Sequence, residues 1–195
     1  MKANIYTFTV LIVTILTIAG CKKDSKDESA KNSLKVDGTE YTMSKGLLVN
    51  YGDYNATYSM ALYLLSSGLT VHELDGLPDS ISGTGNIIVF EINTTGTDKL
   101  APGDYTYSNL YTAGTFSYGI YMLNWNSTQN PDPDLTELKA GTVKIISSGA
   151  TYELSFTGTD INDKAVSGYY KGALKYYTDF KKSGGVTKHG NKLLF

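Results

Sequence analysis

The chain has 195 residues, of which 17 are basic and 19 acidic, giving a net charge of −2, together with 20 glycines, 16 tyrosines and one cysteine. A chain so close to neutral, without a basic stripe, has no field that would collect nucleic acid, so we expect no nucleic-acid partner. One cysteine excludes an internal disulfide, and two histidines are too few for a zinc site, so we expect neither a metal nor a cofactor.

Residues 1–20 are predicted to be a bacterial lipoprotein signal peptide. Lys2 gives the basic start, and the apolar stretch 5–18 is shorter than the roughly 20 residues that span a bilayer. Small residues, alanine and glycine, directly precede Cys21. We therefore predict that the mature chain begins at Cys21 and that its thiol carries the lipid. An uncleaved anchor or an ordinary secretory signal is the alternative, and either leaves Cys21 without a role.

Residues 21–32 are predicted to form a flexible tether, because they contain no large apolar side chain and cannot bury enough surface to become ordered. Within the tether, Lys26-Asp27-Glu28 resembles the surface-export signal of Bacteroidota lipoproteins. The resemblance implies display on the outer face of the outer membrane. A plain solvated linker, with the protein on the periplasmic face, is the alternative.

Residues 33–180 are predicted to form one all-β domain, a single antiparallel meander of eight or nine strands closed as a barrel or packed as a two-sheet sandwich. Alternating apolar and polar residues place the strands at about 33–37, 40–50, 56–66, 86–94, 104–109, 114–125, 136–147, 151–159 and 165–177. The region from Leu69 to Leu77 is interrupted by glycine and proline and is predicted to be a long loop. Residues 181–195 are predicted to be a polar C-terminal tail.

The last predicted strand shows the clearest alternation. One face of it is expected to be buried and carries Val166, Gly168, Tyr170, Gly172, Leu174 and Tyr176. Two glycines on an inward face indicate strong coiling or the close approach of another backbone. This pattern favours barrel-like closure.

Three segments of the C-terminal half, LAPGDY, GTVKI and VSGYYKG, combine turn and strand residues. They resemble segments of small Bacteroidota outer-membrane lipoproteins. The resemblance implies a β-sandwich or a lipocalin-like barrel and a place in the cell envelope. It implies no catalytic residue.

Candidate catalytic residues are few. A Ser-His-Asp site would have to use His72, because His189 lies in the tail, and no Gly-x-Ser-x-Gly turn presents a serine. A glycosidase could pair Glu91 with Glu153, although both are also ordinary polar-face strand residues. We predict no catalytic residue.

Two groups of carboxylates offer oxygen ligands for calcium. They are Asp132 with Asp134, and Asp160 with Asn162 and Asp163. The alternative is that the first is a stiff extended loop and the second an ordinary Asx-rich turn.

Aromatic residues are the more suggestive signal. Phe116, Tyr118, Ile120 and Met122 recur at period two and are predicted to be core. Tyr121 and Trp125 are expected on the opposite face of that strand, where their rings could stack on a sugar or an apolar ligand.

Asp79-Ser80-Ile81 resembles the acceptor sequence for O-glycosylation in exported Bacteroidota proteins. Ser80 is therefore the candidate modified residue.

We expect a lipid-anchored, surface-displayed, non-catalytic binding or accessory module of the bacterial outer membrane. Its expected partners are the membrane, through Cys21, and a glycan, a small apolar ligand or other envelope proteins. The alternatives are a hydrolase acting on extracellular glycan or peptide, and a structural subunit of a surface assembly.

Overall fold

The structure is a computed structural model that describes residues 30–54, 57–129 and 135–178, and these residues form strands, turns and loops without a helix. The strands, in chain order, are β1 (Ser33–Val36), β2 (Thr39–Thr42), β3 (Lys45–Tyr54), β4 (Thr57–Leu65), β5 (Leu69–Leu74), β6 (Leu77–Thr94), β7 (Gly103–Tyr107), β8 (Thr115–Asn126), β9 (Thr136–Ser147), β10 (Tyr152–Asp160), β11 (Ala165–Gly172) and β12 (Leu174–Tyr177).

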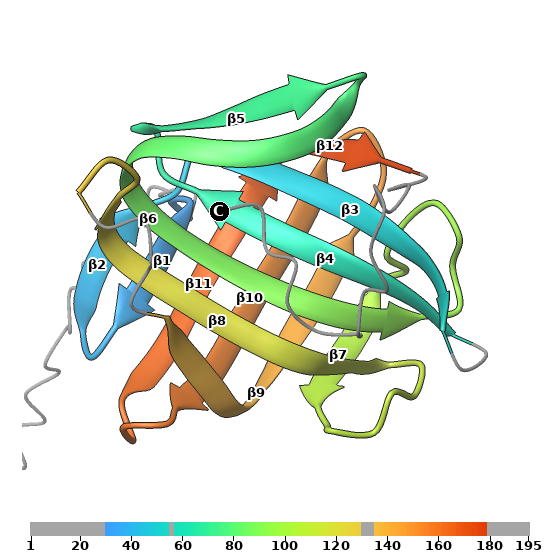
Figure 1. The fold of residues 1–195 in the computed structure, drawn as a ribbon. Helices are drawn as coiled ribbons and strands as arrows, with labels where there is room; N and C mark the ends of the chain where they lie inside the picture. Colours follow the sequence, from blue (N-terminus) through green and yellow to red (C-terminus); the bar gives the residue numbers. More distant parts are fainter. Residues whose placement is uncertain (1–29, 55–56, 130–134, 179–195) are drawn as a thin grey trace, which may run out of the picture.

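These strands form one curled mixed sheet with the shape of a half-barrel (Figure 1). Their order is β12-β3-β4-β6-β8-β7-β9-β10-β11-β1-β2, and β5 pairs with β6 outside this path. In Figure 1 strands β3, β4, β6 and β8 form the front layer, and β9, β10 and β11 cross behind them. The prediction of an all-β domain is confirmed, but the predicted eight or nine strands are too few, because the described residues form twelve.

The prediction of a purely antiparallel meander is wrong, because β12 runs parallel to β3 and β7 runs parallel to β8. The predicted strand 165–177 breaks at Ala173, where the chain leaves β10 and β1 and continues along β3. A strand that changes partner without reversing its direction can meet the new partner in parallel. Alternation along the sequence cannot reveal such a change, because it reports faces and not neighbours.

The predicted loop from Leu69 to Leu77 is also wrong, because it forms β5 and the start of β6. Asp75 and Gly76, with φ of 54° and 78°, form a two-residue hairpin turn between these strands. Asp-Gly is a strong signal for such a turn, since both positions need positive φ. Pro78 is tolerated because this part of β6 pairs with β5 alone.

The front strands are apolar on both sides. The interior cluster lies between the two layers and is centred on Phe90, whose ring centroid is 5.5 Å from Phe116 and 5.2 Å from Phe156. A second cluster, here called the outer apolar face, lies on the other side of the front layer. Its buried residues are Leu47, Val49, Ala61, Tyr63, Leu65, Leu69, Ile81, Ile87, Val89, Ile120, Met122, Trp125 and Tyr177.

The predicted core row of β8 is divided between these two sides. Phe116 belongs to the interior cluster, whereas Ile120 and Met122 belong to the outer apolar face. The register shifts where Phe116 and Tyr118 face β6, so that Ser117 is an extra residue. A bulge of this kind reverses the alternation beyond it, which is why a single period-two row could not be extended through this strand.

Gly168 confirms the predicted close approach on the inner face of the last strand. A Cβ atom at this position would lie 2.2 Å from Cζ of Phe156 and 2.3 Å from the carbonyl oxygen of Ser33. The second contact is with the backbone of β1, so a change of side-chain rotamer cannot relieve it. Glycine is required here for β1 to lie against β11.

We expect Gly168→Ala to lower the free energy of unfolding by about 1–3 kcal/mol, the usual cost of overpacking a core. Chemical denaturation of the purified protein measures this change. Ser167→Ala, on the half-exposed side of the same strand, is the matched control and should leave stability nearly unchanged. Equal stabilities for the two variants would contradict the close approach.

Candidate functional site

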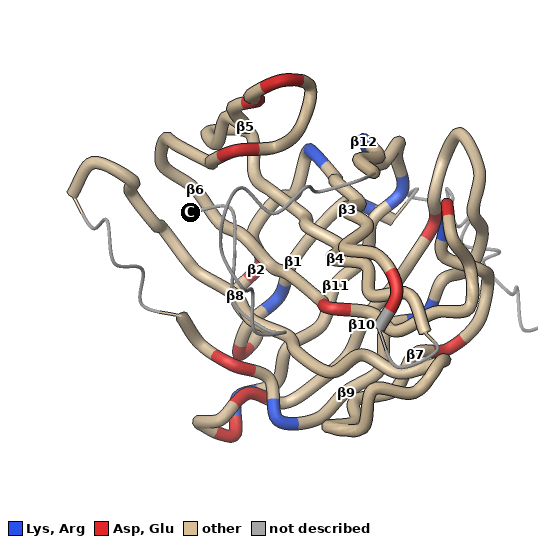
Figure 2. The backbone as a smooth tube through the Cα atoms, turned by 45° about the vertical axis from the view of Figure 1, so that its right-hand side comes forward, with Lys and Arg blue, Asp and Glu red and all other residues tan. Residues whose placement is uncertain are grey.

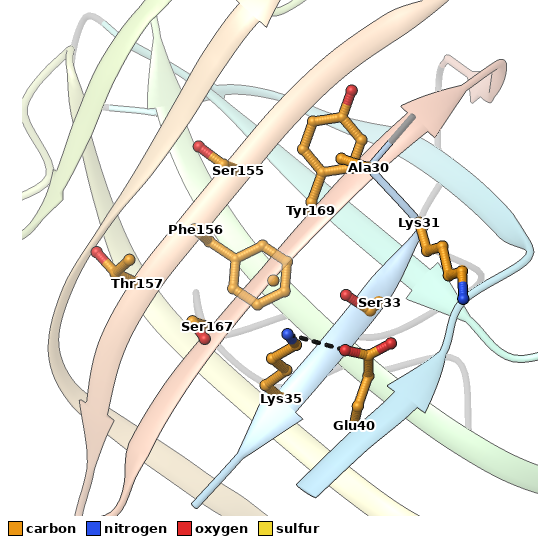
Figure 3. Close-up of a pocket in the computed structure, with 11 residues that line it drawn as sticks. Ala30, Lys31, Ser33, Lys35, Glu40, Ser155, Phe156, Thr157, Ser167 and Tyr169 are labelled. Carbon is orange, nitrogen blue, oxygen red and sulfur yellow. Dashed lines mark ion pairs between the residues drawn. The ribbon is translucent and has the colours of Figure 1, made fainter. Parts of the chain in front are cut away.

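A groove lies on the outer face of β10, β11, β1 and β2 (Figure 3). Two rows of residues that are neighbours across the strands run along it. In the first row, Tyr169 of β11 lies between Ser155 of β10 and Ser33 of β1. The second row, in strand order, is Thr157, Ser167, Lys35 and Glu40.

The groove exists because short side chains lie among long ones. Its lining carries the hydroxyl groups of Ser33, Ser155, Thr157 and Ser167 together with Phe156 and Gly168, and its volume is about 500 Å³. In Figure 3 the ring of Tyr169 stands at one end, and Lys35 and Glu40 stand at the other. Ala30 and Lys31, in the segment before β1, complete one side.

Charges at the two ends of the groove are paired. Lys35 Nζ lies 2.8 Å from Glu40 Oε2, and this lysine holds the pKa of Glu40 below its usual value. Beyond the other end, Lys171 Nζ lies 2.9 Å from Glu153 Oε2. Hydrogen bonds from Lys171 and then Tyr169 lower the pKa of Glu153, so this carboxylate is ionised at neutral pH. The Tyr169 hydroxyl donates to Glu153 Oε1 at 2.8 Å, and this bond fixes its ring.

This arrangement suits a neutral polar ligand. Hydroxyl groups both donate and accept hydrogen bonds, and an aromatic ring offers a face for stacking. The described lining contains neither histidine nor cysteine. Figure 2 shows acidic and basic residues scattered over the described strands and turns rather than gathered by sign.

Buried side chains of the interior cluster pack against one another inside the half-barrel. Several tyrosine hydroxyls from this region donate to backbone carbonyls in nearby loops, at 3.0 Å from Tyr105 to Ala101, 2.9 Å from Tyr170 to Ala173 and 2.9 Å from Tyr176 to Thr97. These bonds satisfy the polar ends of the rings while their apolar parts pack in the core. The tyrosines of the interior therefore serve the fold.

Tyr121 and Trp125 do not share a face. Tyr121 belongs to the interior cluster and Trp125 to the outer apolar face, and they are 5% and 6% exposed. A second register shift between them, opposite the segment from Gly85 to Ile87, moves Trp125 to the other side of β8. The two candidates for ligand stacking are therefore not brought together.

Asp160 closes the turn before β11 instead of presenting free ligands to calcium. Its Oδ1 accepts from the backbone N–H groups of Asn162 at 2.8 Å and Lys164 at 2.9 Å, and its Oδ2 accepts from the Tyr121 hydroxyl at 2.6 Å. Asp163 is paired with Lys139 at 2.6 Å. Asp160 is fully buried, so these donors stabilise a carboxylate that water does not reach.

The other candidate carboxylates are separated or lie outside the described residues. Glu91 of β6 accepts from Ser59, whereas Glu153 of β10 belongs to the network of Tyr169 and Lys171. The two glutamates do not form a pair. Asp132 and Asp134 lie outside the described residues.

His72 does meet a serine, since its Nε2 lies 2.6 Å from Ser82 Oγ across the β5–β6 hairpin. The pair is exposed, and among the described residues the hydrogen bonds of this ring include no carboxylate. Ser80, the candidate for O-glycosylation, is half-exposed on the same hairpin beside a buried Ile81. Cys21 and His189 lie outside the described residues.

The groove residues Ser33, Ser155, Ser167 and Tyr169 were missed by the sequence analysis. The sequence pattern that could have indicated the groove is the occurrence of small polar residues on the solvent-facing sides of three strands. Seeing them as one site requires the pairing of β1 with β11, which joins residues more than a hundred positions apart.

No protein-family model, curated protein or solved structure matches this chain. Within the described ranges there is no helix with the length and apolar character to cross a membrane. The fold and the groove therefore carry the functional interpretation by themselves.

The Tyr121–Asp160 bond gives a test by pH. Burial and then the hydrogen bond to Asp160 raise the pKa of Tyr121 from 10.0 to about 12. Because the pKa is raised, the protonated Tyr121 contributes its full stabilisation to the folded protein below pH 10, and this contribution is lost as the pH rises towards 12. A shift of two pKa units corresponds to about 2–3 kcal/mol in the free energy of unfolding.

We expect Tyr121→Phe to be less stable than the original protein at pH 7 by about 1.5–3 kcal/mol, because Asp160 loses a donor. The difference should shrink between pH 10 and 12, where the original protein loses the same interaction. Denaturation curves of both proteins across this range measure it. A stability difference that stays constant to pH 12 would contradict the raised pKa of Tyr121.

Proposed function

We propose that this protein is a lipid-anchored binding module of the bacterial outer membrane, displayed on the cell surface, and that it binds a neutral glycan in the groove of β10, β11, β1 and β2. The half-barrel acts as a solid, lipocalin-like scaffold, with its ligand on the outside. The observation that carries the proposal is a hydroxyl-bearing lining with a fixed tyrosine ring at its end.

A glycan is the ligand class that this chemistry favours. Sugar hydroxyls exchange hydrogen bonds with serine and threonine, and the apolar face of a sugar ring packs on an aromatic ring. The charged groups at both ends of the groove are already paired within the protein, so an ionic ligand would have to compete with these pairs. A neutral ligand would not.

The short distance along the chain between the groove and the proposed lipid anchor at Cys21 also supports glycan binding at the membrane surface. Ala30 and Lys31 line the groove, and Cys21 lies only nine residues before Ala30. An extended segment of that length reaches about 30 Å. The proposed tether would therefore hold the groove close to the membrane surface, within reach of glycans attached there.

Glycan-array screening of the detergent-solubilised full-length lipoprotein should identify the ligand. We then expect Tyr169→Ala to weaken binding about 3- to 10-fold through loss of stacking, and Tyr169→Phe to keep most of it. Tyr58→Ala, a half-buried tyrosine of β4 outside the groove, is the matched control. The glycan assignment fails if no array glycan binds, or if Tyr58→Ala weakens binding as much as Tyr169→Ala.

Protease shaving of intact cells tests the proposed address. We expect intact cells to release fragments of the domain, and Cys21→Ala to remove the protein from the membrane fraction, because the lipid is the anchor. Mass spectrometry of intact and lysed samples reads both results. Release from lysed cells alone would place the protein on the periplasmic side and overturn surface display.

A further inference from the structure

The outer apolar face is buried more deeply than the described elements on that side account for. Val49, Ala61, Val89 and Ile120 are between 0% and 2% exposed. The β5–β6 hairpin packs on one end of this face through Leu69 and Ile81. Figure 1 draws no other described strand across β4, β6 and β8 on this side. A continuous apolar sheet face requires a covering layer.

A buried carboxylate on this face indicates the charge of the cover. Glu91 follows Val89 on the same side of β6 and is 9% exposed, and it accepts a hydrogen bond from Ser59 Oγ at 2.9 Å. Within the described part of the chain, no ion pair includes Glu91. A buried charge is stable only when a counter-charge or several donors reach it.

Asn93, two residues further along the same side of β6, also has a buried acceptor that requires a donor. It is fully buried, its Nδ2 donates to Thr115 Oγ1 at 3.1 Å, and its Oδ1 has no partner among the described residues. Burial and then the carboxylates of Glu137 and Glu91 raise the pKa of the neighbouring Tyr118, which reports a negative potential here. An amide oxygen without a donor, beside a carboxylate without a counter-charge among the described residues, favours an ammonium group in the cover, because it both donates and carries positive charge.

The described part of the chain ends beside this face, and the residues that follow in the sequence have the matching composition. Tyr177, at the end of β12, belongs to the outer apolar face and pairs with Val49 of β3. Residues 179–195 contain four lysines against one aspartate, and apolar side chains at Phe180, Val186, Leu193, Leu194 and Phe195. Seventeen residues can extend over about 55 Å, whereas β3 to β8 spans only about 15 Å.

We propose that residues 179–195 of the same chain dock on the outer apolar face, with their apolar side chains over its centre and a lysine ammonium paired with Glu91. The segment would keep an apolar surface away from water in an exported protein. This inference is independent of glycan binding, which uses the opposite side of the molecule.

Photo-crosslinking of the full-length lipoprotein tests the docking. Tyr118→benzoylphenylalanine places a probe on this face, and Tyr169→benzoylphenylalanine places a matched one in the groove; both tyrosines are half-exposed. We expect peptide mass spectrometry to find crosslinks from position 118 to residues 179–195 of the same molecule, and none from position 169. Crosslinks from position 118 to a second copy or another protein, their absence, or equal crosslinking from position 169 would overturn the proposal.

A double-mutant cycle tests the charge pairing. Glu91→Gln and the joint replacement of Lys181, Lys182, Lys188 and Lys192 by Gln should each lower the melting temperature, and together they should lower it by less than the sum. The control is Glu153→Gln, which removes a glutamate already paired with Lys171 and should be additive with the lysine replacements. Additive effects for Glu91 would exclude the pairing of a lysine of this segment with Glu91.

Discussion

The contact on which the structure depends is the packing of β1 against β11 at Gly168. The Phe156 ring and the Ser33 carbonyl both occupy space that any larger residue would fill. Because the two backbones come this close, β11 can pair with β1. The chain then continues from β11 into β12, which pairs with β3. The curl of the sheet and the position of the N-terminal strand thus depend on a residue without a side chain.

The same contact creates the proposed binding surface. Ser33 and Lys35 reach the groove only because β1 lies in register with Tyr169 and Ser167 of β11. Phe156 fills the interior directly beneath Gly168, so the inner side of this strand is closed to a ligand. With the interior cluster packed inside it, the half-barrel offers its outer faces to the proposed ligand.

The two outer faces have opposite chemistry. Strands β10, β11, β1 and β2 present hydroxyl groups and paired charges to water, which suits recognition of a polar ligand. Strands β3, β4, β6 and β8 present a buried apolar surface with a carboxylate at its margin, which suits a permanent cover. Tyrosines serve both purposes, since a ring can pack while its hydroxyl finds a partner, as Tyr121 does with Asp160.

The sequence by itself determined that the domain is all-β, where most strands lie, and that the inward glycines of the last strand indicate strong coiling or a close approach, which the structure shows as a close approach at Gly168. Alternation and turn chemistry are local, so residues within one strand can reveal them. Only the tertiary structure decided that β12 pairs in parallel with β3, that bulges send Tyr121 and Trp125 to opposite sides, and that Ser33 joins Tyr169 in one groove. Strand partners and register depend on contacts between residues far apart in the chain, and no local pattern encodes them.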